Sequence, residues 1–139
     1  MIRRHNILFH TDAPQSIGKV PVDVKSLEVD FLTIAGYKLY APKGIGASYI
    51  RNGINIEPLI HGAGHEGGKR AGTENIIFDV ALGKACEISM AALKSSEIKQ
   101  LTEYFYNSLK EKFVDKTHLN GHPEKRLPNT LNISFLGYN

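Results

Sequence analysis

Long apolar runs, disulfide-forming cysteines and concentrated positive charge are all scarce in this sequence. No apolar stretch approaches the ~20 residues that a membrane-spanning helix needs, and the N-terminus lacks the apolar region of a signal peptide. The single cysteine, Cys86, excludes an internal disulfide and fits a reducing compartment, so we expect a cytoplasmic protein. The 17 Lys and Arg residues are scattered among 14 Asp and Glu residues, without a basic stripe that carries interleaved aromatics. Neither a membrane role nor a nucleic-acid partner is therefore predicted.

What is present is typical of a globular α/β protein. The chain has 139 residues, of which 42% are hydrophobic and 22% charged, enough for one ordinary domain with a core. Short apolar runs predict strands at residues 7–10, 31–34, 47–51 and 130–135, with an extended link at 20–24. Residues 11–15 should form a polar turn, residues 52–53 a hairpin turn, and the glycine-rich residues 61–73 a loop.

Two helical patterns follow the glycine-rich loop. The first begins near residues 73–75, with Thr73 as a plausible N-cap. Its expected apolar face consists of Ile77, Ala81, Ile88 and Ala92. The second pattern consists of Ile98, Leu101, Phe105, Leu109 and Phe113. The join at residues 95–96 contains neither Gly nor Pro, so both one long helix and a bent pair are compatible with it.

Lys38 is the strongest candidate for chemistry. It follows an apolar strand, with small residues before it and glycines after it, a setting that suits covalent attachment of an aldehyde cofactor. Lysine amines form Schiff bases with pyridoxal 5′-phosphate (PLP). A PLP site also needs a carboxylate beside the pyridine nitrogen, a donor near the phenolic oxygen and groups that neutralise the phosphate. The chain offers Asp12 and Gln15 at one strand end, and Arg70 and Thr73 at the end of the loop.

These residues lie in four blocks that together resemble one enzyme family. The blocks are residues 10–15 (His-Thr-Asp-Ala-Pro-Gln), 36–47 (Gly-Tyr-Lys-Leu-Tyr-Ala-Pro-Lys-Gly-Ile-Gly-Ala), 61–66 (His-Gly-Ala-Gly-His-Glu) and 70–75 (Arg-Ala-Gly-Thr-Glu-Asn). In order and spacing they are similar to the cysteine desulfurases, a family of the class V aminotransferase group that includes selenocysteine lyases. The resemblance extends from about Ile7 to Phe135, which is nearly the whole chain.

The resemblance implies a role for each candidate residue. Asp12 would pair with the pyridinium nitrogen of PLP, and Gln15 would hydrogen-bond the phenolic oxygen. Lys38 would hold the cofactor covalently and move the substrate α-proton. Thr73 would reach the phosphate of the partner subunit's cofactor, which implies a homodimer. Arg70 would shape the same loop. No metal ligands are implied.

The resemblance also implies a fold and a reaction. Residues 1–93 would be part of the PLP-binding large domain with a mostly parallel sheet, and residues 94–139 the start of the small C-terminal domain. The reaction removes sulfur from L-cysteine, or selenium from selenocysteine, leaving alanine. In the desulfurases the sulfur passes through a persulfide on an enzyme cysteine to an iron–sulfur scaffold or another acceptor.

The chain departs from the family pattern in two ways. Tyr37 precedes the lysine where the family usually has histidine, and Ala35 stands where a serine is often found. Tyr37 can still donate one hydrogen bond to the cofactor phosphate and is kept as a cofactor-binding candidate, whereas Ala35 cannot donate, so we expect weaker PLP binding. The chain is also about a third of the usual family length. It lacks the ring-stacking histidine and the loop with the persulfide cysteine, and Cys86 is expected to be a small buried helix thiol instead. We therefore expect an internal fragment with little activity alone. The alternative is a non-catalytic remnant or interaction module that dimerises with a full-length desulfurase.

Three weaker patterns have ordinary interpretations. Residues 62–67 match G-x-G-x-x-G without the strand-to-helix context of a dinucleotide site. The pairs His61/His65 and His118/His122 have the H-x-x-x-H spacing of metal ligands but lie among turn residues, so loop histidines are favoured. Residues 104–106 (Tyr-Phe-Tyr) are expected to pack at the core and its rim.

Overall fold

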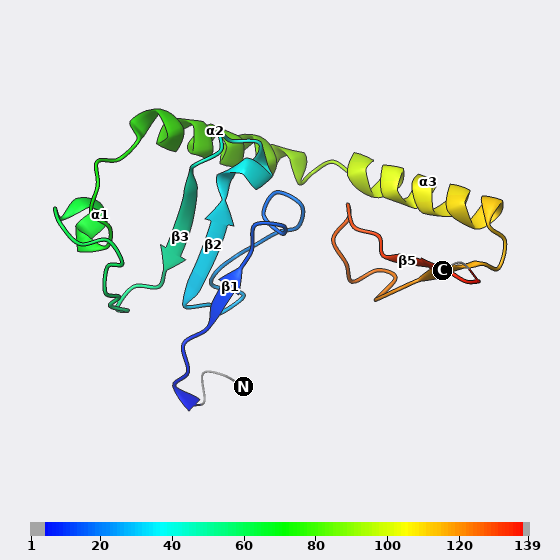
Figure 1. Cartoon of the computed structure of the whole chain (residues 1–139), viewed down its shortest axis with the longest axis horizontal. Coiled ribbons are helices and arrows are strands. Elements are labelled where there is room, and N and C mark those ends of the chain that lie inside the picture. The colour runs from blue at the N-terminus through cyan, green and yellow to red at the C-terminus, as the bar shows by residue number, and fades with distance from the viewer. Residues whose placement is uncertain (1–4, 138–139) are drawn as a thin grey trace.

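A computed structural model describes residues 5–137 of the chain. Its main sheet has the order β1-β2-β3, formed by β1 (His10–Asp12), β2 (Phe31–Ala35) and β3 (Gly46–Ile50). β1 runs parallel to β2, and β3 runs antiparallel to it. A short 3-10 helix, η2 (Gly36–Leu39), follows β2 directly. The predicted α/β class is confirmed, and the sheet in this part of the chain is mixed (Figure 1).

The helices follow the sheet in sequence, and α2 (Ile76–Ala92) lies along one end of it (Figure 1). They are the short α1 (His65–Gly68), α2 (Ile76–Ala92) and α3 (Glu97–Lys112). Residues 93–96 separate α2 from α3, so the bent pair is correct and the single long helix is wrong. Among the helices of residues 5–137, none has the length and apolar character to cross a membrane.

A second, two-stranded sheet follows α3 in the sequence. It consists of β4 (Thr117–Leu119) and β5 (Ile133–Phe135), paired antiparallel. The strand predicted at 130–135 is confirmed in its second half. β4 was missed, because three residues that include a polar Thr and His carry too little periodicity to be recognised. Phe113 and Phe135 meet edge-to-face at 5.2 Å and join α3 to this sheet.

The core consists of two small clusters. The first contains Ala13, Val29 and Leu32, packed against the residues that link β1 to β2. The second contains Leu39, Ala41 and Ala85, and it joins η2 to α2. The residue that follows Lys38 is thus buried against a helix, which fixes the position of η2.

Two predictions about these elements were wrong. The strand expected at residues 7–10 begins only at His10, and Ile7 and Leu8 are 58% and 57% exposed. An apolar run forms a strand only where a neighbouring strand can hydrogen-bond to it. Hydrogen bonding to the β2 segment starts at Phe9, so the residues before Phe9 stay outside the strand. As a result Thr11 and Asp12 lie in the strand instead of the expected turn.

The expected apolar face of the first helix was also wrong. Ile77 and Ile88 are 79% and 59% exposed, whereas Leu82, Ala85 and Cys86 pack on the core. α2 is apolar on most of its circumference, so residue spacing does not reveal which side is covered. On α3, Tyr104 and Phe105 are exposed whereas Tyr106 is half-buried, so the packing expected for residues 104–106 is found only at Tyr106.

Candidate functional site

Most of the candidate residues lie at one edge of the main sheet. Because β1 and β2 are parallel, their carboxyl ends meet at the same edge, where α/β proteins bind ligands. Asp12 is the last residue of β1 and stands opposite Thr33 of β2. Gln15 lies in the turn that follows β1, and Lys38 lies in η2 directly after β2. The sequence order therefore places a carboxylate, an amide and a lysine beside one another in the fold.

Asp12 lies on the face of the sheet that the core clusters leave uncovered. Side chains alternate along a strand, so Asp12 shares its face with His10 and, across the ladder, with Thr33. His10 Nε2 and Thr33 Oγ1 are 2.8 Å apart. The opposite face carries the buried Leu32. Asp12 is exposed, so its carboxylate is accessible from this open face.

Backbone geometry holds Lys38 in place. The Gly36 N–H donates to the Ile45 carbonyl over 2.9 Å, and a Cβ at Gly36 would lie only 2.7 Å from that oxygen. This close approach requires glycine. Leu39 is buried at 4% exposure, and Tyr40 ends η2 in the left-handed region with φ 65°. Lys38 is therefore half-buried between two fixed neighbours.

Tyr37 contacts the lysine itself. The Lys38 Nζ lies 5.0 Å from the centroid of the Tyr37 ring, within the range of a cation–π interaction. Tyr37 is 51% exposed. The sequence could not indicate this contact, because adjacent residues face one another only in particular backbone conformations, and here they belong to a single 3-10 turn.

A cavity of about 400 Å³ lies beside Lys38 on the α2 side. Its walls include Lys38, Leu39, Ala81 and Ile88. Asp12, Gln15 and Thr73 are not part of them. The structure thus brings Asp12, Gln15 and Lys38 to the same edge of the sheet without enclosing them in one cavity.

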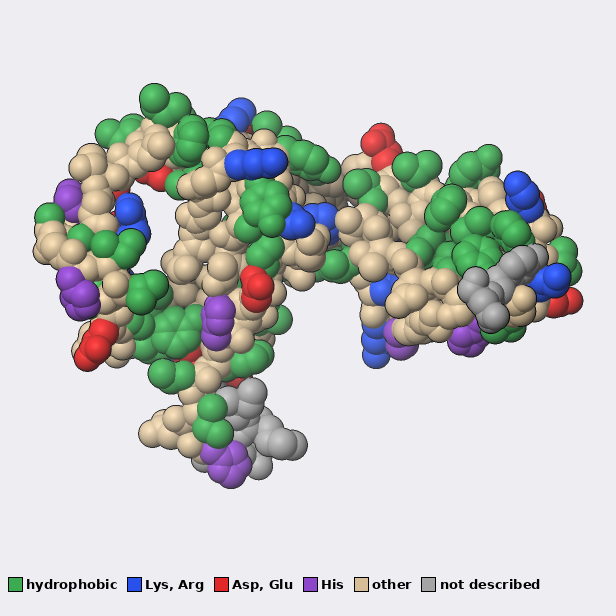
Figure 2. All heavy atoms as spheres, in the orientation of Figure 1, with side chains coloured by type: hydrophobic (Ala, Val, Ile, Leu, Met, Phe, Trp, Pro, Cys, Tyr) green, Lys and Arg blue, Asp and Glu red, His purple; other side chains and the backbone are tan. Residues whose placement is uncertain are grey.

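Thr73 lies apart from the other candidates. The segment of residues 61–75 stands beyond β3, on the opposite side of the sheet from β1 (Figure 1), and the space-filling view shows an opening between it and the sheet (Figure 2). Thr73 is exposed there. It is not the helix cap that we predicted, because α2 starts at Ile76 and the Asn75 side chain accepts from the Phe78 N–H. Asx residues are strong N-caps, so Asn75 takes that position.

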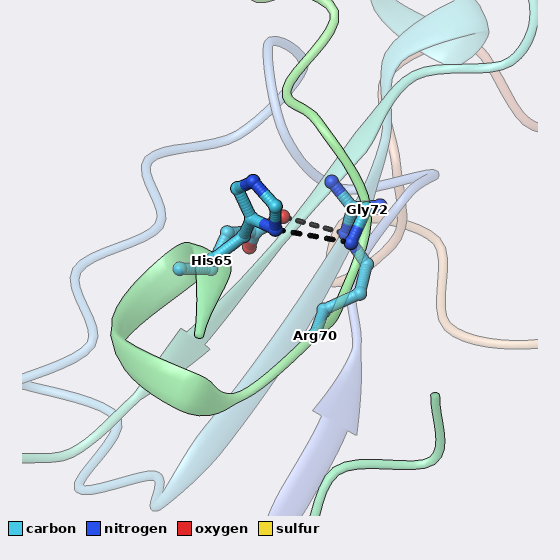
Figure 3. Close-up of polar contacts among 4 residues, drawn as sticks. His65, Arg70 and Gly72 are labelled. Atoms are coloured by element: carbon cyan, nitrogen blue, oxygen red, sulfur yellow. Dashed lines mark hydrogen bonds and ion pairs between the residues drawn. The ribbon is translucent and has the colours of Figure 1, made fainter. Parts of the chain in front are cut away.

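Internal contacts shape the segment before Thr73 (Figure 3). His65 Nδ1 accepts a hydrogen bond of 3.3 Å from the Gly72 N–H, which assigns the ring proton to Nε2 in the neutral tautomer. Arg70 Nε and Glu66 Oε1 form an ion pair at 2.6 Å within the same segment. The Ala71 N–H donates to the Ile60 carbonyl over 3.1 Å. Residues 60–72 thus form a closed loop that presents Thr73.

The same segment perturbs one carboxyl group. The pKa of Glu74 is lowered, first by a hydrogen bond to its own backbone amide and further by the nearby charges of His65 and Arg70. Partial desolvation acts in the opposite direction but is outweighed.

Sequence reasoning missed Asp30. This residue directly precedes β2 and is only 2% exposed, and it contacts Phe9 and Arg51 on either side. The one available signal was an aspartate directly before an apolar strand, because a buried carboxylate needs a partner.

The weaker patterns do not form sites in this structure. The glycines at 62–67 lead into α1, a helix of 4 residues, so the strand-to-helix unit of a dinucleotide site is missing there. Within residues 5–137, no group of three His, Cys, Asp or Glu side chains is arranged to hold a metal ion. His65 and His122 both accept backbone hydrogen bonds through Nδ1, which is an ordinary structural use.

A model of the aminotransferase class-V family matches residues 1–139. The chain belongs to that family. Members of this family use PLP, and the cysteine desulfurases form a branch of it, as the resemblance predicted. The chain is 46% identical over 135 residues to cysteine desulfurase IscS of Methanosarcina thermophila, covering 96% of this chain and 33% of that protein.

Solved structures agree with this assignment. The NifS-like protein of Rickettsia africae matches with a TM-score of 0.87 and 30% identity, covering 99% of this class-V chain and 38% of the other. A structure of SspA in complex with cysteine matches with a TM-score of 0.73 and 37% identity, covering 96% of this chain and 37% of the other. The chain spans about a third of the length of the curated relatives that it matches.

Proposed function

We propose that this chain carries the lysine-bearing part of a PLP-dependent cysteine desulfurase. The observation that carries the proposal is the placement of Asp12 and Lys38 at the carboxyl ends of two parallel neighbouring strands. That placement occurs in a class-V chain with relatives named cysteine desulfurases, and a similar structure, SspA, was solved in complex with cysteine. The proposed substrate is L-cysteine, with selenocysteine as the other candidate, and the proposed products are alanine and transferable sulfur.

The residues at the sheet edge fit the cofactor. A pyridinium nitrogen needs a carboxylate with a free approach, and Asp12 is exposed on the open face. An aldehyde needs a held amine, and Lys38 is half-buried between Gly36 and Leu39. PLP, when bound, supplies an electron sink for the substrate's α-carbon. In our proposal Asp12 keeps the ring nitrogen protonated, Gln15 donates to the phenolic oxygen, and the Lys38 amine carries the substrate α-proton.

Thr73 is proposed to act on a second subunit. It is exposed on a loop that stands beyond β3, away from the edge with Asp12 and Lys38. A hydroxyl in that position is better placed to contact the cofactor phosphate bound in a partner subunit than the one bound in its own subunit. The proposal therefore includes a homodimer. It also includes the division into a large-domain part, residues 1–93, and a small-domain part, residues 94–139, which is supported by the break between α2 and α3.

The complete reaction is proposed to need more of the family fold than this chain contains. Cys86 is half-buried in α2 and packs against the second core cluster, so it is poorly placed to carry a persulfide. We expect little desulfurase activity from the chain alone. In the complete reaction an iron–sulfur scaffold or another acceptor would take the sulfur.

Exposed apolar side chains favour a second candidate function, in which the chain is a non-catalytic partner of a full-length desulfurase. Ile76, Ile77 and Val80 of α2 are 71%, 79% and 68% exposed, and green side chains follow α2 along its outer border (Figure 2). Neighbouring exposed apolar side chains of this kind mark interaction surfaces. Co-purification with a full-length relative, in the absence of any PLP linkage to Lys38, would favour this candidate.

The deciding experiment is PLP labelling. The purified chain is mixed with PLP, its visible absorbance recorded, the linkage fixed with borohydride and the peptides mapped by mass. We expect a pyridoxyl mass on Lys38, and Lys38→Arg should remove the absorbance band. Lys43, an exposed lysine five residues further on, is the internal control, and Lys43→Arg should leave the band unchanged. Labelling spread equally over surface lysines would refute the proposed site.

A further inference from the structure

Asp30 is a buried carboxylate that the proposed chemistry does not use. It is 2% exposed and directly precedes β2, at the end of the strand opposite Lys38. A buried carboxylate is costly unless it is paired and hydrogen-bonded, so its contacts indicate its role.

Its contacts join all three strands of the main sheet. Asp30 Oδ2 accepts a 2.7 Å hydrogen bond from the Phe9 N–H, just before β1. The Asp30 N–H in turn donates to the Phe9 carbonyl over 2.8 Å. On the other side, Asp30 Oδ1 lies 2.6 Å from Arg51 Nη2, and the Arg51 N–H donates to the Asp30 carbonyl over 2.9 Å. Asp30 thus binds Phe9, the residue before β1, and Arg51, the residue after β3, through both its side chain and its backbone.

β1 needs such an anchor more than its neighbours do. It has only three residues, and the residues before it, Ile7, Leu8 and Phe9, are consecutively apolar. A strand without apolar–polar alternation specifies its register weakly, and a slip of one residue turns every side chain to the other face. Such a slip would turn Asp12 away from the open face and bring Thr11 there instead.

We propose that Asp30 is a positioning residue that pins Phe9, fixes the register of β1 on β2 and so keeps the Asp12 carboxylate on the open face. The register itself is a property of the chain. Only the consequence for the cofactor rests on the proposed function.

Thiol reactivity measures the register directly. In a Cys86→Ser background, Thr11→Cys and Asp12→Cys are made one at a time, and their rates of alkylation are compared. Native register makes the thiol at position 12 the faster, because Asp12 is exposed and Thr11 half-buried. Asp30→Ala should lower the ratio of the two rates by about tenfold, the effect of one lost charge-assisted hydrogen bond. Asp30→Asn keeps an acceptor for the Phe9 N–H and should retain a ratio near the native one.

Two further variants separate register from stability. Leu119→Ala weakens the distant β4–β5 sheet and should leave the ratio unchanged. The double variant Asp30→Leu/Arg51→Leu replaces the ion pair by apolar side chains, a change that folded proteins often tolerate, and it should still lower the ratio. A lower melting temperature for Asp30→Ala with an unchanged ratio would overturn the proposal, as would an equal fall of the ratio in Leu119→Ala.

PLP labelling then tests the link to the site. With Asp12 and Cys86 intact, Asp30→Ala should reduce labelling of Lys38 relative to Lys43, and Asp30→Asn should restore it. If the native chain does not label Lys38 selectively, the proposed function fails while the thiol measurement still decides the register. If labelling of Lys38 is unaffected by a proven change of register, the positioning role for Asp12 is overturned.

Discussion

At the scale of single residues, the departure at position 37 gains a physical meaning from the structure. In the proposed site Tyr37 stands where the cysteine desulfurases usually have a histidine that donates to the phosphate, and its ring lies against the Lys38 amine. An ammonium group held over an aromatic face must leave that contact before it can bind an aldehyde. In our proposal a tyrosine at this position therefore affects both the phosphate contact and the release of the lysine amine for PLP binding.

Tyr37→His should strengthen PLP binding at Lys38. Restoring one charge-assisted hydrogen bond corresponds to about 1.5–3 kcal/mol, or about tenfold to a hundredfold in the dissociation constant. Titration of the visible absorbance with PLP measures it. Tyr40→His places the same imidazole on the nearby, fully exposed Tyr40 and should change little. Equal gains from both variants would mean that the new histidine acts nonspecifically.

At the scale of elements, the start of α2 distinguishes the residue that caps the helix from an exposed hydroxyl just before it. Asn75 caps the helix through its hydrogen bond to the Phe78 N–H, and Thr73 lies outside the helix with an exposed side chain. Two polar residues that look equivalent in the sequence therefore have different surroundings, and only Asn75 should contribute to the stability of the helix.

Asn75→Ala should destabilise the chain by about 1 kcal/mol, the usual cost of a lost N-cap. Thr73→Ala is the matched control and should change the free energy of unfolding far less. Urea unfolding followed by circular dichroism measures both. A larger loss for Thr73→Ala than for Asn75→Ala would restore Thr73 as the cap.

Glu74 makes the same segment sensitive to acid. Its pKa in the folded chain is below the ordinary 4.5, so its stabilising contribution is present above that value. The contribution is lost as the pH falls through the lower, folded pKa. Stability should therefore decline more steeply below pH 4.5 in the native chain than in Glu74→Gln. Identical acid unfolding curves would contradict the shift, as would an NMR titration of the Glu74 carboxyl at its ordinary value.

The sequence predicted some elements well, and the reasons for the failures are physical. β2 and α3 were recognised because an apolar strand and an amphipathic helix each carry their own period. β1 was misplaced because its start depends on a hydrogen bond from Phe9 to a residue 21 positions away. The order Asp12, Gln15, Lys38 could be foreseen at one sheet edge, whereas the Asp30 anchor and the Tyr37–Lys38 contact depend on tertiary geometry.

At the scale of the whole molecule, exposed apolar side chains lead us to expect that the chain associates with other chains. On α2 and α3 the large apolar residues with more than half of their surface exposed are Ile76, Ile77, Val80, Ile88, Met90, Ile98, Leu101, Tyr104 and Phe105. The chain also spans about a third of its curated relatives. Apolar surface of this extent favours association, either between copies of this chain or with a longer relative.

Ile77→Glu combined with Val80→Lys should weaken that association by about tenfold, since buried apolar contacts at an interface commonly contribute more than 1 kcal/mol each. Sedimentation over a range of protein concentrations measures it. Asn107→Glu adds a charge to an exposed position of α3 and serves as the control. Unchanged association in the α2 double variant would place the contact surface elsewhere.

The reactivity of the native Cys86 thiol provides a measure of how α2 packs, without any substitution. It is the chain's one cysteine, it is half-buried, and it packs in the cluster that contains Leu39, the neighbour of Lys38. We therefore expect its rate of alkylation to depend on how closely α2 packs on η2. A ligand that steadies the lysine segment should slow this reaction, and one that displaces the segment should quicken it, so the native thiol can serve as a screening signal for compounds or partner proteins.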